Sequence, residues 1–143
     1  MTIMLQLAEK ASDVRQHFSK FIDSVVRDRP GFMTRNRDTL ATLNYEHLVA
    51  LTKPLRFHAS IQQDENGDFI ATLEEIDDLV AVGANVDEAL TVLAQDLMEY
   101  AQEYWTDSFR VYFNAPNRRD HFPYVFKIAM QNSVDDVKRL INA

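Results

Sequence analysis

The chain has 143 residues, of which 46% are hydrophobic, and it carries a formal net charge of −7 at pH 7. A chain of this length buries about 70% of its unfolded surface, which is enough for a stable core. The absence of cysteine excludes disulfides and thiolate metal sites. No stretch approaches the roughly 20 apolar residues of a membrane-spanning helix, and no signal peptide opens the chain, so we expect a cytoplasmic protein without a membrane partner.

The charges are distributed unevenly along the chain. Residues 1–56 hold nine Lys or Arg and six Asp or Glu, a net charge of +3, whereas residues 57–143 hold six and sixteen, a net charge of −10. A basic first part and an acidic remainder suit two different partners. The alternative explanation is the patchy surface of an ordinary soluble protein.

The first third of the chain begins with a predicted strand and a helix. Residues 3–7 are short and apolar enough to form an edge strand. Ser12 is placed to cap the helix that follows. The apolar face of that helix has three- and four-residue spacing and consists of Val14, Phe18, Phe21, Ile22 and Val25. Arg29-Pro30-Gly31 ends the helix, because the residue before a proline disfavours helical backbone.

A hairpin with a basic tip is predicted next. Two β-favouring runs, 32–34 and 40–43, flank the polar tip 35–38, in which Asn and Asp tolerate the left-handed backbone of a tight turn. Asn44 then caps a short helix that ends at Lys53-Pro54, where we place a domain boundary. Such a small three-stranded sheet is near the minimum for independent stability, so pairing with a second copy is expected.

This order of signals resembles the DNA-binding half of the Phd/YefM antitoxin family. The residues that carry the resemblance are Ser12, Val14, Arg15, Pro30, Thr34, Arg35, the run 40–43 and Tyr45-Glu46-His47-Leu48. The resemblance implies a module that pairs into a homodimer and binds operator DNA with basic residues from helix and loop. The chain departs from the family at the hairpin tip, where glycine is usual and this chain has Asn36-Arg37-Asp38.

Four basic side chains are therefore the candidate DNA-binding residues: Lys10, Arg15, Arg35 and Arg37. Arg15 lies on the first exposed turn of its helix, and Arg35 and Arg37 stand at the hairpin tip, where they can reach phosphates or a groove edge. A twofold dimer would double this set and present it to two half-sites. Each arginine alone is more simply explained as a solvated charge or an ion pair. Arg15 and Arg35 together, at the family's positions, favour DNA.

Residues 55–105 show a different pattern, which predicts three strands and a helix. Alternating side chains at 57–62 indicate the first strand, and residues 69–73 and 79–82 indicate the second and third. Asn66-Gly67 lies between the first two strands and is the strongest short-range signal of a hairpin.

Asn85 and Glu88 have the spacing of a capping box, which predicts the start of the long helix of this module. The β-β-β-α order resembles the HicB-type antitoxin fold, a partly RNase H-like unit without nuclease activity. The residues that carry it are Asp64, Gly67, Phe69, Ala71, Leu73, Gly83, Glu88, Ala89 and Leu90. That family usually has Pro and Gly where this chain has Glu75-Ile76-Asp77-Asp78. The resemblance implies docking on a small basic ribonuclease toxin.

Residues 106–143 are predicted to form a mostly helical C-terminal extension. We expect a short strand at 110–113, a loop at 116–119, a helix at 123–129 and a last helix capped by Ser133. The aromatic surface of the extension must be covered by the protein itself or by a partner, and cover by the protein itself is the commoner case.

The sequence offers no pattern typical of catalysis. None of the four histidines has a second ligand at metal-site spacing: His17, His47, His58 and His121. Acidic residues at 64–68 and 74–78 are most simply solvated turn carboxylates, although paired carboxylates can hold Mg²⁺. No Walker loop, dinucleotide fingerprint or nucleophile elbow occurs. We therefore expect no enzymatic activity, no metal and no cofactor.

The sequence thus predicts an α+β protein with three parts: a Phd/YefM-like module at residues 1–54, a HicB-like module at 55–105 and the extension at 106–143. It predicts the antitoxin of a type II toxin–antitoxin system. Such a protein would neutralise a RelE-like or HicA-like ribonuclease, whose basic surface suits an acidic cover, and would repress its own operon as a DNA-bound dimer. The alternatives are a non-catalytic protein- or small-ligand-binding module without DNA binding, and an RNase H-like nuclease.

Overall fold

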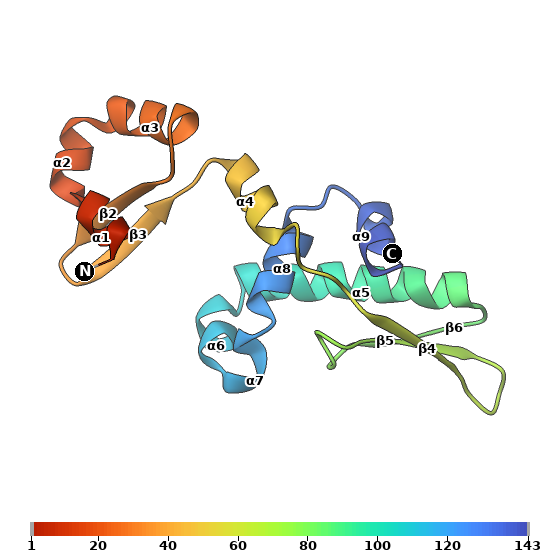
Figure 1. Ribbon diagram of the computed structural model, residues 1–143. Helices are drawn as coiled ribbons and strands as arrows, with labels where there is room; N and C mark the ends of the chain where they lie inside the picture. The colour runs from red at the N-terminus through yellow and green to blue at the C-terminus, as the bar shows by residue number, and fades with distance from the viewer. Residues whose placement is uncertain (1, 143) are drawn as a thin grey trace. The chain divides into compact units, whose positions relative to one another are not determined.

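The computed structural model describes residues 2–142 and has an α+β fold (Figure 1). It divides into two compact units, one ending at Leu51 and the other beginning at Thr52. Each unit contains its own three-stranded sheet and its own hydrophobic core. Among the described residues, no helix combines the length and the apolarity needed to cross a bilayer.

The first unit is a small sheet with short helices. Its elements are α1 (Ile3–Leu7), β1 (Glu9–Lys10), α2 (Ala11–Gln16), α3 (Phe18–Arg27), β2 (Gly31–Arg35), β3 (Asp38–Thr42) and α4 (Tyr45–Thr52), whose last residue belongs to the second unit. Strand β2 lies between β1, which runs parallel to it, and β3, which runs antiparallel. Val14, Phe21 and Val25 from α2 and α3 form the buried core, and Ile22 packs against it. Phe18, which the helical spacing also placed on the apolar face, is 59% exposed.

Three sequence predictions in the first unit are wrong. Ser12 does not cap a helix, because α2 begins at Ala11 and its N-cap residue is Lys10. Residues 3–7 form helix α1 rather than a strand, with the Thr2 hydroxyl accepting a hydrogen bond from the Leu5 N–H at 3.2 Å. The edge strand is instead Glu9–Lys10. The single helix expected after Ser12 is interrupted at His17, whose φ and ψ of −124° and 39° are not helical. A five-residue apolar run does not distinguish helix from strand by periodicity, so this error has a physical origin.

The hairpin tip has the conformation that its residues allow. Arg35 pairs with Asp38, which leaves Asn36 and Arg37 as a two-residue turn. Asn36 has a φ of 56°, and this left-handed backbone confirms that asparagine can replace the glycine usual in the related family. Asn44 accepts a hydrogen bond from the Glu46 N–H at 3.0 Å, which confirms its role as the cap of α4.

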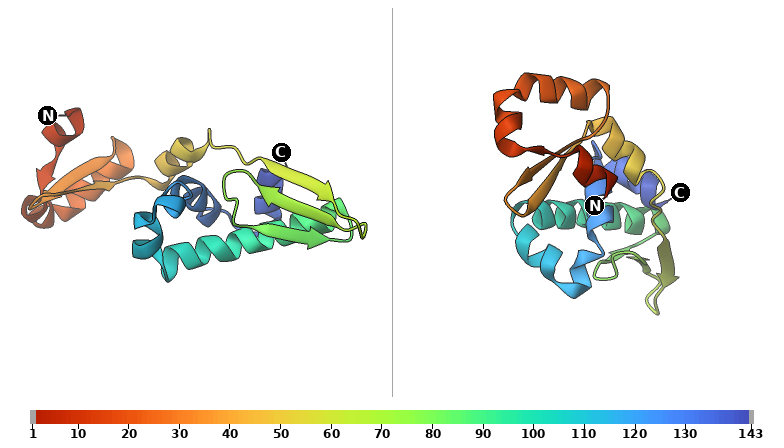
Figure 2. Two further views of the ribbon diagram at one scale, coloured as in Figure 1. Left: turned by 90° about the horizontal axis from the view of Figure 1, so that it is seen from below. Right: turned by 60° about the vertical axis from the view of Figure 1, so that its left-hand side comes forward.

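The second unit is built in layers around one long helix (Figures 1 and 2). Its elements are β4 (Ala59–Gln63), β5 (Phe69–Leu73), β6 (Val80–Gly83), α5 (Val86–Thr106), α6 (Phe109–Asn114), α7 (Pro116–Arg119), α8 (Phe122–Ala129) and α9 (Val134–Ile141). The three strands form an antiparallel meander. Helix α5 packs on one face of this sheet, and α8 and α9 pack against α5 from its other side.

Local signals placed these elements correctly. The Asn85 side chain accepts from the Glu88 N–H at 2.8 Å, and the Glu88 carboxylate accepts from the Ala84 N–H at 3.1 Å, so both ends of the capping arrangement are made. The β4–β5 turn contains Gly67 with a φ of 83°. Asp64 holds the turn through hydrogen bonds from the Asn66 and Asp68 N–H groups, each at 2.9 Å.

The C-terminal extension is helical throughout, in part against expectation. Residues 110–113 belong to helix α6 rather than a strand, and residues 116–119 form helix α7 rather than a loop, with Pro116 in its first turn. Helices α8 and α9 are confirmed, and the Ser133 hydroxyl caps α9 by accepting from the Asp136 N–H at 3.2 Å.

The extension completes the core of the second unit. Val125, Ile128, Val137 and Ile141 are buried in the same cluster as Leu73 of the sheet. This agrees with the expectation that the protein covers much of its own aromatic and apolar surface.

Lys127 ties the connecting segment after α4 to this core. Its Nζ donates to the backbone carbonyls of Leu55 at 2.8 Å and Lys53 at 3.4 Å. The residue is buried, and this burial lowers the pKa of its ammonium group. The two carbonyls partly replace the water that the charge has lost.

Candidate functional site

Three of the four predicted DNA-binding residues line one concave surface in the first unit. The concavity has a volume of about 590 Å³ and is lined by Lys10, Ala11, Ser12, Arg15, Thr34, Arg35 and Asn36. These cations are separate in the sequence, and the fold brings Lys10, Arg15 and Arg35 together.

The local structure explains why these cations meet. Strand β1 pairs in parallel with β2 so that Lys10 lies opposite Thr34, next to Arg35 at the end of β2. Helix α2 starts directly after Lys10 and carries Arg15 in its last turn. A two-residue strand followed at once by a helix therefore delivers two cations to the tip of the hairpin.

Arg37 is placed differently from the other three. It is the second turn residue of the β2–β3 hairpin and is exposed, but it is not among the residues that line the concavity.

The four cations are available for an external anion. All four are exposed, and within the described part of the chain none of them has a carboxylate within 4.0 Å. The ion pairs that could have explained Arg15 and Arg37, with Glu9, Asp13 or Asp38, are therefore not formed. A cluster of cations without internal partners is the electrostatic property that binding to phosphates requires.

A second group of polar residues lies close together in the second unit, and no sequence motif predicts it. His58, Glu74 and Glu75 have potential ligand atoms within 4.8 Å of one another. The Glu75 carboxylate already accepts from the His58 backbone N–H at 2.5 Å and lies 3.1 Å from the His58 ring Nδ1. Since both oxygens contact His58, this group fastens the loop after β5 to the chain entering β4.

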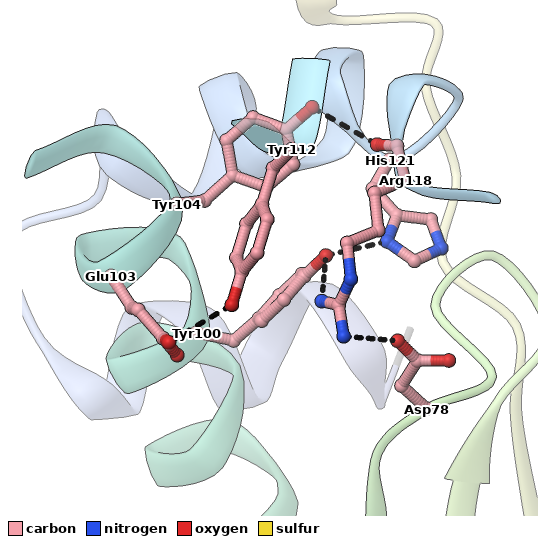
Figure 3. A network of polar contacts seen from close by, with 7 residues as sticks. All are labelled: Asp78, Tyr100, Glu103, Tyr104, Tyr112, Arg118 and His121. Carbon is pink, nitrogen blue, oxygen red and sulfur yellow. Dashed lines mark hydrogen bonds and ion pairs between the residues drawn. The ribbon is translucent and has the colours of Figure 1, made fainter. Parts of the chain in front are cut away.

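A polar network joins α5 to the extension and to the β5–β6 loop (Figure 3). The Arg118 guanidinium donates to the Tyr100 hydroxyl at 3.1 Å and forms an ion pair with Asp78 at 3.2 Å. The Tyr100 hydroxyl also lies 2.6 Å from Nδ1 of His121. Because the guanidinium can only donate, the phenol hydrogen of Tyr100 is free to be donated to that ring nitrogen. Tyr104 donates to the Arg118 carbonyl at 2.9 Å.

Aromatic rings surround the charged centre of this network. The Arg118 guanidinium lies 4.3 Å from the ring centroid of Tyr112, and the Tyr112 hydroxyl donates to Glu103 at 2.9 Å. No sequence motif predicts this network, because its members are separated by irregular distances along the chain. The sequence feature that accompanies the network is a high density of Tyr and Phe between residues 100 and 126.

Burial sets the protonation of the network. His121 is 5% exposed, and burial lowers the pKa of its imidazole, with nearby Asp78 acting in the opposite direction. Burial also raises the pKa values of Tyr100 and Tyr104. These directions favour a neutral imidazole and neutral phenols, which is the state that the hydrogen bonds between them need.

The lowered pKa of His121 makes the stability of the second unit depend on pH. Unfolded histidine has a pKa of about 6.5, so below that pH the unfolded state takes up a proton more readily than the folded state. The free energy of unfolding should therefore fall as the pH decreases below about 6.5. Denaturant unfolding at pH 7.5 and 5.5, followed by fluorescence of the single tryptophan, Trp105, measures this change. In His121→Gln the difference between the two pH values should shrink; an unchanged difference would show that other groups cause it.

The chain was also compared with known proteins. Residues 4–143 match the PHD-like family, described as antitoxins of RelE/RelB toxin–antitoxin systems. A crystal structure from Syntrophomonas wolfei subsp. wolfei, described as the antitoxin part of a proposed toxin/antitoxin system, is similar at 40% sequence identity and a TM-score of 0.84. This similarity covers 94% of this chain and 95% of that one. No curated protein matches.

The family match extends over both units rather than over the basic module alone. The chain therefore belongs to the PHD-like family of toxin–antitoxin antitoxins. This identification gives the chain a cognate toxin as its partner.

Proposed function

We propose that this antitoxin neutralises a ribonuclease toxin by direct binding and represses its own operon by binding operator DNA as a homodimer. The observation that carries the DNA-binding part is the gathering of Lys10, Arg15 and Arg35 around one concave surface without carboxylate partners among the described residues. Arg37 extends this set at the hairpin tip.

The chemistry of these residues suits a DNA backbone. Duplex DNA carries about one negative charge per 1.7 Å of its axis, and cations that neutralise phosphates release bound counterions. Arginine donates in a planar fork that fits phosphate and guanine edges, and its charge persists at all physiological pH values. In each protomer the concavity is lined by two arginine guanidinium groups and one lysine ammonium group.

The small first unit supports the proposal of a dimer. Among its described residues the core contains only three buried side chains, and Phe18, Val26 and Leu40 remain exposed. An isolated sheet of this size is marginal in water, so a second copy would supply the missing burial. Twofold symmetry would also present two basic concavities to two half-sites of one operator.

The charge of the second unit supports a basic toxin as the other partner. Between Arg56 and Arg110 the sequence contains thirteen Asp or Glu and no Lys or Arg. A ribonuclease is basic because it must bind RNA, and complementary charge accelerates association and suppresses wrong partners. We assign the DNA-binding role to a Phd/YefM-like module at residues 1–54. We assign toxin binding to the HicB-like module at 55–105 together with the extension.

Removal of the two arginines tests the DNA-binding site. Arg15→Ala combined with Arg35→Ala should weaken binding to the DNA upstream of the protein's own gene in a band-shift assay. If each arginine contacts one phosphate, a dimer loses four contacts. The slope of log K against log salt should then become less negative by about 3 to 4, because each phosphate contributes about 0.9 to that slope.

The matched control removes two cations elsewhere in the same unit. Lys20→Ala combined with Arg27→Ala changes the net charge equally, and both residues are exposed on α3. This variant should bind more tightly than the Arg15/Arg35 variant. Equal binding by the Arg15/Arg35 variant and the wild type would show that the site is wrong. Failure of the wild type to bind would favour a protein- or ligand-binding module without DNA binding.

A further inference from the structure

The sheet of the second unit has one covered face and one open face. Helix α5 packs on one face, and Figures 1 and 2 show no helix of this unit on the other. The strand register places six side chains on the open face in two rows: Ser60, Thr72 and Val80, and Gln62, Ile70 and Val82. None of them is charged. Val80 and Val82, on the edge strand β6, are 59% and 51% exposed.

Carboxylates occupy both ends of this open face. The β4–β5 turn carries Asp64, Glu65 and Asp68, and the β5–β6 loop carries Glu74, Glu75, Asp77 and Asp78. No Lys or Arg lies between Arg56 and Arg110 in the sequence. Two of the loop carboxylates are partnered within this unit, Asp78 by Arg118 and Glu75 by His58. The other five have no cationic partner among the described residues: Asp64, Glu65, Asp68, Glu74 and Asp77. The surface therefore has an uncharged centre between two anionic ends.

We propose that this open face of the β4–β5–β6 sheet is where the basic partner docks. Under the function proposed above, on which this inference rests, the partner is the cognate toxin. The proposal requires a partner with an apolar or uncharged centre to meet Thr72, Ile70 and Val82. It also requires lysine or arginine side chains on both sides of that centre, which meet the carboxylates of the two loops.

The size of the face explains why the charged ends are needed. Strands about 4.8 Å apart and residues about 3.3 Å apart give two five-residue strands and one four-residue strand an area of about 220 Å². A stable complex covers about 800 Å² on each partner. The partner must therefore extend over the acidic loops, where only complementary cations avoid burying unpaired charge.

Other occupants fit this surface less well. A nucleic acid would be repelled by the thirteen carboxylates of this region. In a second copy of the chain, a twofold axis through the face would bring identical acidic loops together, and like charges across an interface are unfavourable. The edge strand β6 also carries neither the lysine nor the proline that commonly protects an edge against pairing, which is consistent with cover by a partner.

One substitution on this face and one away from it test the proposal. The probe is the purified protein encoded by the reading frame next to this chain's gene, with affinity measured by titration calorimetry. Val82→Arg should weaken binding about 100-fold, the size of a central interface position, because it buries an unpaired cation at the uncharged centre of the interface, between the partner's own basic side chains. Val111→Arg, at a valine of α6 that is 69% exposed, should leave the affinity within about twofold of wild type.

The remaining outcomes separate this inference from the proposed function. If the neighbouring protein binds wild type and Val82→Arg equally, the docking surface is wrong although toxin binding stands. If it does not bind wild type and coexpression does not relieve its toxicity, the proposed function fails, and the inference fails with it. If light scattering shows that Val82→Arg dissociates a dimer while its affinity for the probe is unchanged, a second copy occupies the face and the proposal is overturned.

Hydrogen exchange gives an independent measurement that does not rely on a substitution. Backbone amides of β6 should exchange at least tenfold more slowly in the complex than in the free protein, since the partner covers the edge and the open face. Slowed exchange confined to α8 and α9, with β6 unchanged, would place the partner on the other side of the unit and contradict the proposal.

Discussion

Replacing Tyr104 with alanine should lower the free energy of unfolding of the second unit by about 3–5 kcal/mol. The side chain is fully buried, at 0% exposure, in the last turns of α5. Its ring makes edge contacts with Tyr100, Phe109 and Tyr112 at centroid distances of 5.4 to 5.9 Å and stacks on Phe122 at 6.4 Å. Alanine would leave a cavity that four aromatic rings cannot fill without losing their own contacts.

Fluorescence of Trp105 during denaturant unfolding measures this loss, because the only tryptophan lies next to the substituted residue. Tyr104→Phe is the matched control. It keeps the ring and removes only the hydrogen bond to the Arg118 carbonyl, so it should cost about 1 kcal/mol. If the free energy of unfolding fell no further in Tyr104→Ala than in Tyr104→Phe, the aromatic ring would not be what joins α5 to the extension.

The elements with strong local signals could be predicted from the sequence. Asn85, Glu88 and Ser133 cap helices where expected, and Asn66-Gly67 makes the hairpin turn between β4 and β5. These signals act within four residues, so neighbouring residues alone determine the outcome. The α+β class follows from them and is confirmed.

Elements whose composition suits both helix and strand could not be predicted. Residues 3–7 and 110–113 are short, largely apolar or aromatic runs whose composition does not distinguish helix from strand, and both are helical. In α6, Phe109 and Tyr112 pack against Tyr104 of α5, which a helix permits by placing both rings on one side. Tertiary packing therefore overrides the β preference of Val111, Tyr112 and Phe113.

The sequence names the residues of the candidate DNA site, but it does not predict the concavity that three of them line. The resemblance to known antitoxins predicts Arg15 and Arg35 as DNA-binding residues. The concavity, in contrast, arises from the parallel pairing of Lys10 with Thr34. Lys10 belongs to the two-residue strand β1, whereas the predicted edge strand covers residues 3–7. The open face of the second sheet follows from strand register, which an alternating pattern gives only after the strand order is known.

Gly83 at the end of β6 connects the stability of the second unit to the geometry of that open face. A Cβ atom built on this residue would lie 2.4 Å from the backbone nitrogen of Ala89 and 2.9 Å from its Cα. These atoms belong to the first turns of α5, and backbone within a capped helix cannot rotate away as a side chain can. Even alanine at this position must therefore push β6 and α5 apart.

We expect Gly83→Ala to lower the free energy of unfolding by about 3 kcal/mol, the upper end of the usual cost of overpacking, because backbone rather than a flexible side chain must move. Ala84→Ser, at the exposed neighbouring residue, should stay within about 0.5 kcal/mol of wild type in the same denaturant titration. Because the shift displaces Val82, the neighbouring residue, Gly83→Ala should also weaken partner binding under conditions in which the variant remains folded. A variant as stable as wild type would mean that β6 and α5 approach each other less closely than this contact requires, and the position of Val82 would then have to be reconsidered.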